Sequence, residues 1–255
     1  MTALLTDRTV LVTGATSGFG QAIARRLSAE GARLVVTGRR DDRLQRLVDE
    51  LPGPALALAF DLCDREALDE SLGDLPEPFA AVDVLVANAG LALGLEPAHQ
   101  ARLDDWETMI DTNCRALVRT VRRVLPGMVE RGRGHVVTIG SIAGDWPYPG
   151  GNVYGATKAF VKQFALGLRA DLLGTGVRVT DLEPGLAETE FSLVRFHGDA
   201  DKAKKPYQGV QPLVADDIAD AVLWVVTRPP HVNVSRLEVM PTAQAVTGPT
   251  VFRKG

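Results

Sequence analysis

Three glycines near the start of the chain restrict its fold more than any other feature. Gly14, Gly18 and Gly20 directly follow the apolar run 9–13, which is typical of a buried strand, and precede an apolar pattern at helical spacing. Glycine allows a tight turn and lets the backbone approach a ligand closely, while the free amides at a helix start face an anion. The order strand, glycine turn and helix therefore predicts a site for the pyrophosphate of a dinucleotide; the alternative is a glycine-rich turn without a ligand.

Apolar runs and helical patterns alternate along the rest of the chain. We expect further strands at 33–37, 55–60, 83–87, 135–139, 177–182 and 237–240, and long helices at 106–131, 153–173 and 216–227. Such alternation gives a parallel sheet that is covered by helices on both faces. The expected fold is therefore α/β, a Rossmann-type doubly wound parallel sheet, in a single domain over 1–255.

Ser141, Tyr154 and Lys158 form the candidate catalytic group. Tyr154 and Lys158 are four residues apart and share one face of the helix expected at 153–173. A nearby ammonium favours the phenolate, so Lys158 is expected to lower the pKa of Tyr154 and make it a general base for an alcohol. Ser141 follows the strand expected at 135–139, where its hydroxyl can donate to a substrate oxygen. The alternative is an exposed helix face without chemistry.

Two arginines follow the second expected strand and indicate which dinucleotide binds. An NAD site usually has a carboxylate here, whereas arginine accommodates the 2′-phosphate of NADP. Arg39 and Arg40 occupy this position, and no acid occurs before Asp41. NADP is therefore predicted as the cofactor, because a guanidinium can bind phosphate with two hydrogen bonds. The alternative is a pair of solvated charges at the start of the next helix.

Other polar positions lie where the expected strands and helices would bring them near this site. Asp61 and Leu62 follow the third strand, and Asn88, Ala89 and Gly90 follow the fourth. Asn113 lies within the helix expected at 106–131 and has two open interpretations, a hydrogen bond to a neighbouring carbonyl or support of a proton-relay water. The polar segment 186–211 has no clear secondary-structure pattern and is predicted to be a substrate lid.

Charge and composition exclude several classes of partner. The net charge of −4 gives no basic surface for nucleic acid or an anionic membrane. No apolar run is long enough for a membrane span, and no secretory leader is visible. The four histidines are scattered and the two cysteines, Cys63 and Cys114, have no metal-ligand spacing, so no metal is expected. Reduced cysteines and the missing leader indicate a cytoplasmic protein.

With these motifs in order, the chain resembles the short-chain dehydrogenase/reductase family over nearly all of its 255 residues. The resemblance rests on the glycine turn, the segment 88–90, Asn113, Ser141, the Tyr154 and Lys158 pair, and the segment 184–185. It implies that Asn113, Ser141, Tyr154 and Lys158 are the catalytic residues. The cofactor-binding residues implied by the motifs and the family together are Gly14, Thr16, Ser17, Gly18, Phe19, Gly20, Arg39, Arg40, Asp61, Leu62, Asn88, Ala89, Gly90, Tyr154, Lys158, Pro184, Gly185, Leu186 and Thr189.

Segments 91–99, 105–113, 146–148 and 190–196 resemble a narrower group, the NADP-dependent 3-hydroxy acid dehydrogenases. This group includes serine 3-dehydrogenase, allo-threonine dehydrogenase and malonic semialdehyde reductase. The resemblance implies a homotetramer and a small 3-hydroxy acid substrate. Two departures are visible: Ala87 stands where the family often has asparagine, and segment 185–189 is about one residue shorter than in the group, which affects the lid.

The substrate is expected to contact Ser141, Tyr154 and one cation of the lid. Arg195 lies between Val194 and Phe196, which should seat it against the interior, and its planar fork suits a carboxylate. The alternative is an arginine that pairs with a nearby acid, such as Glu190, to fasten the lid. Two other functions remain open at this point: a reductase of sugars or secondary alcohols, and an NADPH-binding protein without catalysis.

Overall fold

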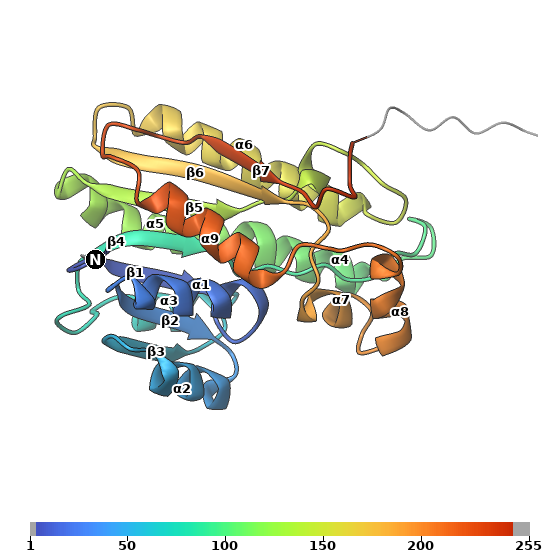
Figure 1. Cartoon of the computed structure of the whole chain (residues 1–255), viewed down its shortest axis with the longest axis horizontal. Coiled ribbons are helices and arrows are strands. Elements are labelled where there is room, and N and C mark those ends of the chain that lie inside the picture. Colours follow the sequence, from blue (N-terminus) through green and yellow to red (C-terminus); the bar gives the residue numbers. More distant parts are fainter. Residues whose placement is uncertain (1–3, 247–255) are drawn as a thin grey trace, which may run out of the picture.

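Among residues 4–246, which the computed structural model describes, a seven-stranded parallel sheet forms the centre of the molecule (Figure 1). Across the sheet the strands are β3 (Ala55–Ala59), β2 (Arg33–Gly38), β1 (Thr9–Thr13), β4 (Val82–Ala87), β5 (Gly134–Ile139), β6 (Val177–Pro184) and β7 (Arg236–Val239). The order reverses between β1 and β4, and in such sheets ligands bind at the carboxyl ends of the strands beside this point. The predicted doubly wound fold is confirmed.

Helices connect the strands. They are α1 (Gly18–Ala29), α2 (Asp41–Glu50), α3 (Arg65–Ser71), α4 (Leu103–Ile110), the π-helix η1 (Asp111–Ala116), α5 (Leu117–Glu130), the 3-10 helix η2 (Ile142–Gly144), α6 (Asn152–Asp171), α7 (Glu190–Arg195), α8 (Ala200–Lys204), the 3-10 helix η3 (Lys205–Tyr207) and α9 (Ala215–Val226). In Figure 1 the carboxyl ends of the strands point to the right, toward α7 and α8.

Each face of the sheet buries the apolar side of a different set of helices. On one face, α1 and α9 pack against each other and α2 covers β2 and β3, with Leu27 and Ile218 fully buried. On the other face, α3, α5 and α6 bury side chains such as Met128 and Val161. A buried side chain of this size contributes roughly 1.5–3 kcal/mol relative to an exposed one. These two cores fix the strand ends at which the site lies.

The single helix predicted over 106–131 is divided in the structure. Helix α4 ends at Ile110, a π-helical turn covers Asp111–Ala116, and α5 continues from Leu117. A π-helical turn widens the helix locally and often occurs at functional sites. Here it contains Asn113, one of the predicted catalytic residues.

The segment 186–211, which shows no clear secondary-structure pattern in the sequence, contains three short helices, α7, α8 and η3. Some of its polar residues act as helix caps. The hydroxyl of Thr189 accepts a hydrogen bond from the amide of Phe191 at the start of α7. The carboxylate of Asp199 accepts one from the amide of Lys202 in α8. Capping satisfies amides at a helix start and allows helices of only one or two turns.

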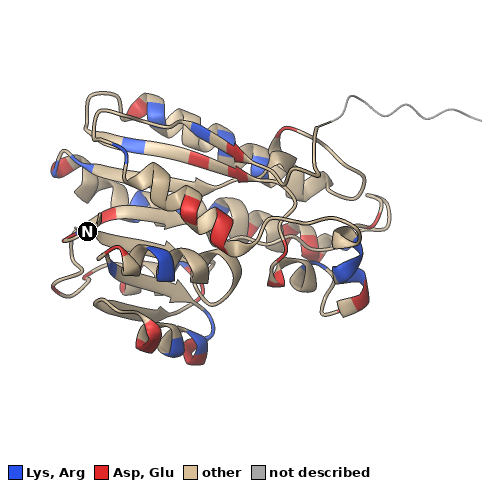
Figure 2. Cartoon of the chain, viewed as in Figure 1, with Lys and Arg blue, Asp and Glu red and all other residues tan. Residues whose placement is uncertain are grey.

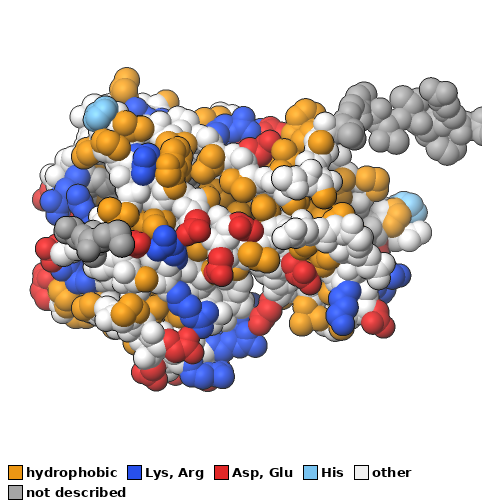
Figure 3. Space-filling view, in the orientation of Figure 1, with side chains coloured by type: hydrophobic (Ala, Val, Ile, Leu, Met, Phe, Trp, Pro, Cys, Tyr) orange, Lys and Arg blue, Asp and Glu red, His pale blue; other side chains and the backbone are white. Residues whose placement is uncertain are grey.

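Positions of both charge signs are spread along the helices and strands (Figure 2). Figure 3 shows charged and apolar side chains mixed over this face of the molecule. No helix in 4–246 is long and apolar enough to span a membrane.

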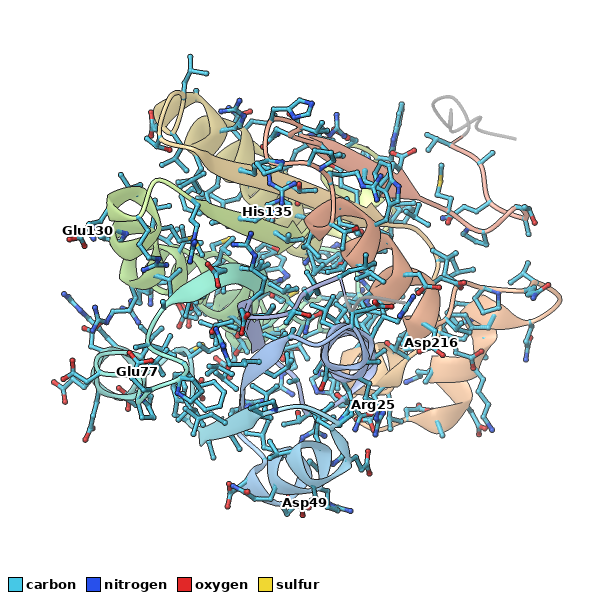
Figure 4. All side chains as sticks on the ribbon, turned by 60° about the vertical axis from the view of Figure 1, so that its left-hand side comes forward. Arg25, Asp49, Glu77, Glu130, His135 and Asp216 are labelled. Carbon is cyan, nitrogen blue, oxygen red and sulfur yellow. The ribbon has the colours of Figure 1, made fainter. Side chains whose placement is uncertain are left out.

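His135 lies inside the sheet (Figure 4), where its Nε2 atom is 2.8 Å from the hydroxyl of Thr180. No group of three or more potential metal ligands occurs among the described residues.

Candidate active site

The glycine-rich turn lies between the carboxyl end of β1 and the start of α1. Gly14 and Gly18 have φ angles of +67° and +53°, which other residues rarely adopt. A Cβ atom on Gly20 would lie 2.4 Å from the carbonyl oxygen of Gly14. Asn88, beyond β4, fixes the turn, because its Nδ2 atom donates to the carbonyl oxygens of Thr13 at 2.9 Å and Gly14 at 3.2 Å. The turn is therefore held open as a backbone cradle.

A cavity of about 1270 Å³ begins at this turn and extends to α7 and η3. It exceeds the roughly 300–1,000 Å³ of pockets for drug-sized ligands, so it has room for a dinucleotide and a small substrate. The predicted site residues that line it are Gly14, Thr16, Ser17, Gly18, Phe19, Arg39, Arg40, Asp61, Leu62, Asn88, Ala89, Gly90, Ser141, Tyr154, Lys158, Pro184, Gly185, Leu186, Thr189 and Arg195. Gly20 and Asn113, which do not line it, lie behind its wall.

The two arginines at the end of β2 differ in their surroundings. The guanidinium of Arg40 donates to the hydroxyl of Thr16 at 2.6 and 3.1 Å and to that of Ser17 at 2.9 Å. Arg39 lines the cavity, and its side chain makes no hydrogen bond or ion pair within 4–246. A guanidinium without an anion beside a glycine turn fits the 2′-phosphate and pyrophosphate of NADP. The residues present therefore suit this cofactor.

Glu190, at the start of α7, connects the segment 186–211 to the arginine side of the cavity. Its carboxylate forms ion pairs with Arg43 at 3.0 Å and with Arg40 at 3.4 Å. These arginines lower the pKa of Glu190 below its usual value, although burial acts in the opposite direction. The predicted alternative, in which Glu190 pairs with Arg195, is therefore wrong.

Ser141, Tyr154 and Lys158 meet at the carboxyl end of β5. Ser141 caps the start of η2, and its hydroxyl accepts a hydrogen bond from the amide of Ala143 at 3.1 Å. Tyr154 and Lys158 lie on α6, with the Lys158 Nζ atom 5.8 Å from the centre of the tyrosine ring. Nζ donates a 2.7 Å hydrogen bond to the carbonyl oxygen of Ile139. The three predicted side chains are therefore brought together.

The expectation that Lys158 lowers the pKa of Tyr154 is wrong for this arrangement. Burial raises the pKa of Tyr154, while its hydrogen bond with Ser141 and the charge of Arg195 act in the opposite direction. Burial also lowers the pKa of Lys158 to about 8, and the carboxylate of Asp181 partly opposes this effect. For Tyr154, the cost of burying the phenolate thus exceeds the opposing effects of Ser141 and Arg195.

Asn113 makes its contacts with the protein itself. Its Oδ1 atom accepts from the amide of Leu91 at 2.8 Å, and its Nδ2 atom donates to the carbonyl oxygen of Leu91 at 2.8 Å and to the hydroxyl of Thr157 at 3.0 Å. The neighbouring-carbonyl interpretation is confirmed, and the water relay stays a prediction. These bonds connect the π-helical turn to the segment after Gly90 and to α6.

Several cavity residues were not predicted as site residues. Trp146, Tyr148, Phe191 and Tyr207 all line it. Their aromatic character was a visible signal, but they come from three separate segments and only the fold shows that they meet. The carbonyl oxygen of Ile139, which accepts the hydrogen bond of Lys158, is a backbone group, so no residue type in the sequence could indicate its role.

This fold and site define a dinucleotide-dependent oxidoreductase, because the anion-binding turn and a hydroxyl-bearing proton-transfer group share one cavity. The chain belongs to the short-chain dehydrogenase family: the family model described as short chain dehydrogenase matches residues 8–198. The predicted family and its class of enzyme are confirmed.

Known proteins and solved structures resemble the chain over almost its whole length. It is 58% identical over 245 residues to an NADP-dependent 3-hydroxy acid dehydrogenase of Salmonella typhi, covering 96% of this chain and 99% of that protein. It is 50% identical over 246 residues to a serine 3-dehydrogenase of Rhizobium radiobacter, covering 96% and 98%. A closed form of serine dehydrogenase complexed with NADP+ matches with a TM-score of 0.95 and 57% identity, covering 96% of this chain and all of that one.

Proposed function

We propose that the chain is an NADP-dependent dehydrogenase of small 3-hydroxy acids such as serine, allo-threonine or 3-hydroxypropionate. One observation carries the proposal: the glycine turn and the group of Ser141, Tyr154 and Lys158 line the same cavity. The relatives named as NADP-dependent 3-hydroxy acid dehydrogenase and serine 3-dehydrogenase support the cofactor and the substrate class. The reaction interconverts the 3-hydroxyl and 3-oxo forms of the substrate.

The cofactor would lie across the glycine turn, with Arg39 and Arg40 beside its 2′-phosphate and Lys158 beside its nicotinamide ribose. When bound, NADP supplies the hydride acceptor or, when reduced, the hydride donor. Asp61 and Leu62 lie on the wall that would face the adenine, and segments 88–90 and 184–186 supply further backbone contacts. Thr189 stands next to Gly18, since a Cβ atom there would lie 3.4 Å from the threonine side chain.

Tyr154 transfers the proton. In oxidation it accepts the proton of the substrate hydroxyl, and in reduction it donates a proton to the carbonyl oxygen. Ser141 donates a hydrogen bond to the same oxygen and holds it against Tyr154. Because burial raises the pKa of Tyr154, the phenol carries its proton at neutral pH. This state suits proton donation to a carbonyl.

Lys158 and Asn113 position these groups. Lys158 holds α6 to the end of β5 through the carbonyl of Ile139, and Asn113 joins α6 to the segment after Gly90. Asn113 is also proposed to maintain a water path for the transferred proton. Both residues are buried, so their geometry is fixed by the surrounding core.

The assembled form is proposed to be a homotetramer located in the cytoplasm. Helices α4, α5 and α6 carry exposed apolar residues, among them Ile110, Val118 and Phe160, with 43%, 37% and 42% of their surface exposed. Burying such residues in a subunit interface would stabilise the assembly. The two free cysteines, Cys63 and Cys114, support a reducing compartment.

Replacing Tyr154 with phenylalanine tests the function directly. The change removes the transferable proton and little volume, so turnover of 3-hydroxy acids should fall by roughly 10²-fold or more. Binding of NADPH, followed by its fluorescence, should remain close to that of the parent. A variant with nearly parental turnover would reject Tyr154 as the proton-transfer residue. A parent that oxidises none of a panel of 3-hydroxy acids would reject the substrate class.

A further inference from the structure

Arg195 has an unusual position at the end of α7. Its guanidinium carbon lies 5.1 Å from the centre of the Tyr154 ring, 5.4 Å from that of Phe191 and 5.7 Å from that of Tyr148. A guanidinium within about 6 Å of an aromatic ring is attracted to its face, most strongly where water is excluded. Three rings, two from the segment 148–154 and one from α7 itself, thus surround one cation at the wall of the cavity.

The hydrogen bonds of Arg195 are incomplete. Its Nη2 atom donates to the hydroxyl of Tyr148 at 2.6 Å. Within the described part of the chain no residue accepts a hydrogen bond from Nε or Nη1, and Nε is closed off from solvent. No acid within 4–246 forms an ion pair with Arg195, since Glu190 on the same helix is paired with Arg40 and Arg43. A partly buried cation without an anion points to an anionic ligand.

The other cations of the cavity wall are placed differently. Arg39 and Arg40 lie at the glycine-turn end, and the Nζ atom of Lys158 is bonded to the carbonyl of Ile139. The lid lysines Lys202, Lys204 and Lys205 are exposed and do not line the cavity. Arg195 is therefore the lining cation that lies next to Tyr154 and has a free donor edge.

We propose that Arg195 binds the carboxylate of the substrate while the 3-hydroxyl group lies against Ser141 and Tyr154. In a 3-hydroxy acid, two carbon–carbon bonds separate the carbinol carbon from the carboxylate carbon. A short ligand of this kind can span from the tyrosine hydroxyl to a guanidinium that is stacked on the same ring. Tyr148 is the positioning residue, because its hydroxyl fixes one nitrogen of the fork. This inference rests on the proposed function and deepens it.

The backbone of the lid is held independently of the Arg195 side chain. The carbonyl oxygen of Arg195 accepts a hydrogen bond from the amide of Gly94 at 2.9 Å. His197, two residues further, lies 3.2 Å from the carboxylate of Asp105. A change of the side chain alone therefore leaves these contacts in place. Arg195→Met retains much of the length and apolar surface of the side chain. It can therefore test the role of the positive charge while the backbone contacts of the lid stay in place.

The kinetic test compares an acid with its neutral analogue, 3-hydroxypropionate and 3-hydroxypropanamide, for the parent and Arg195→Met. Loss of a charge-assisted hydrogen-bonded contact should lower kcat/KM for the acid by roughly 10²-fold and for the amide by only a few-fold. Any effect of the Arg195 charge on Tyr154 is the same for both substrates, so it cancels in the ratio of kcat/KM for the acid to kcat/KM for the amide. Arg195→Lys should recover part of the ratio, and the control Lys204→Met should leave it unchanged.

A binding measurement provides a readout without turnover. Malonate and malonamide are titrated calorimetrically into the NADP-loaded parent and the NADP-loaded Arg195→Met variant. Malonate affinity should fall more than tenfold in the variant, while weak malonamide binding should change little. Equal malonate affinity, or an equal kinetic loss on acid and amide, would overturn the assignment and leave the proposed function standing. A parent inactive on every 3-hydroxy acid would instead remove the proposed function itself.

Discussion

The Nζ atom of Lys158 lies 2.7 Å from the carbonyl oxygen of Ile139 and donates its hydrogen bond there. Ile139 is the last residue of β5, two positions before Ser141, so this bond connects α6 to the strand end that carries the serine. The same lysine lies 5.8 Å from the ring of Tyr154. The relative position of the serine and the tyrosine therefore depends on a buried side chain that bonds to backbone.

Lys158→Met should lower turnover strongly and change the stability of the folded chain only slightly. The variant loses the cation and its bond to Ile139, so turnover should fall by roughly 10²-fold or more. Burial of the ammonium is itself unfavourable, as its pKa of about 8 indicates, so the free energy of unfolding should change by less than about 1.5 kcal/mol. Steady-state kinetics and urea denaturation measure the two effects. The matched control is Lys162→Met on the same helix, whose lysine pairs with Asp145 and should matter little for turnover.

Arg39→Ala should reduce the preference for NADP. This guanidinium lines the cavity without a partner in 4–246, so removing it disturbs no described contact. We expect about tenfold weaker NADP binding for the single variant and about 10²-fold for Arg39→Ala with Arg40→Ala, at nearly constant NAD affinity. Fluorescence titration with both reduced cofactors measures the two affinities. The control is Arg46→Ala, in the helix that follows Arg39 and Arg40. Equal weakening of both cofactors would show that the arginines serve the fold.

The strands were predictable from the sequence because parallel strands in the centre of a sheet are buried on both faces. The run predicted at 9–13 coincides with β1, whose residues are all buried. The glycine turn was predictable for a similar local reason, since φ angles above zero at Gly14 and Gly18 require glycine. Features set within a few neighbouring residues are thus visible without a structure.

The short helices of the segment 186–211 and the surroundings of Arg195 were less predictable because they depend on distant contacts. Tyr148 meets Arg195 across 47 residues of sequence, and helix α7 has only 6 residues, which gives almost no periodic signal. The π-helical turn at Asn113 was hidden because its pattern resembles that of a regular helix. The direction of the pKa shift of Tyr154 depends on burial of the side chain, which the spacing of Tyr154 and Lys158 in the sequence does not reveal.

The exposed apolar residues of α5 and α6 should be buried between subunits. Light scattering of the parent should then report a tetramer, and a monomer at micromolar concentration would contradict the assembly. Val118→Glu with Phe160→Glu places charge on this face and should dissociate the assembly. Gln45→Glu on α2, which covers β2 and β3 on the other face of the sheet, adds charge to an exposed site and should leave the mass unchanged.

Asp181 should make the stability of the folded chain depend on pH between about 4 and 7. It is fully buried on β6, accepts a 2.6 Å hydrogen bond from the hydroxyl of Thr138, and leaves its Oδ2 atom without a partner within 4–246. Burial raises its pKa from 3.8 to about 7, helped by Glu183 and opposed by Thr138 and Lys158. Because the folded state then holds a proton that the unfolded state has released, this stabilisation is present below about pH 4 and is lost as the pH rises through about 7.

Asp181→Asn removes the titration and can keep the Thr138 hydrogen bond through its amide oxygen. The unfolding free energy of the variant, relative to the parent, should therefore rise between pH 4 and 7, by about 1.4 kcal/mol for each unit of the pKa shift that is removed. Urea denaturation at one fixed protein concentration, repeated at each pH, measures the difference. Thr138→Val is the control: the carboxyl group remains, so the decline toward pH 7 should persist. Parallel profiles for Asp181→Asn and the parent would show that Asp181 keeps an ordinary pKa in the folded chain.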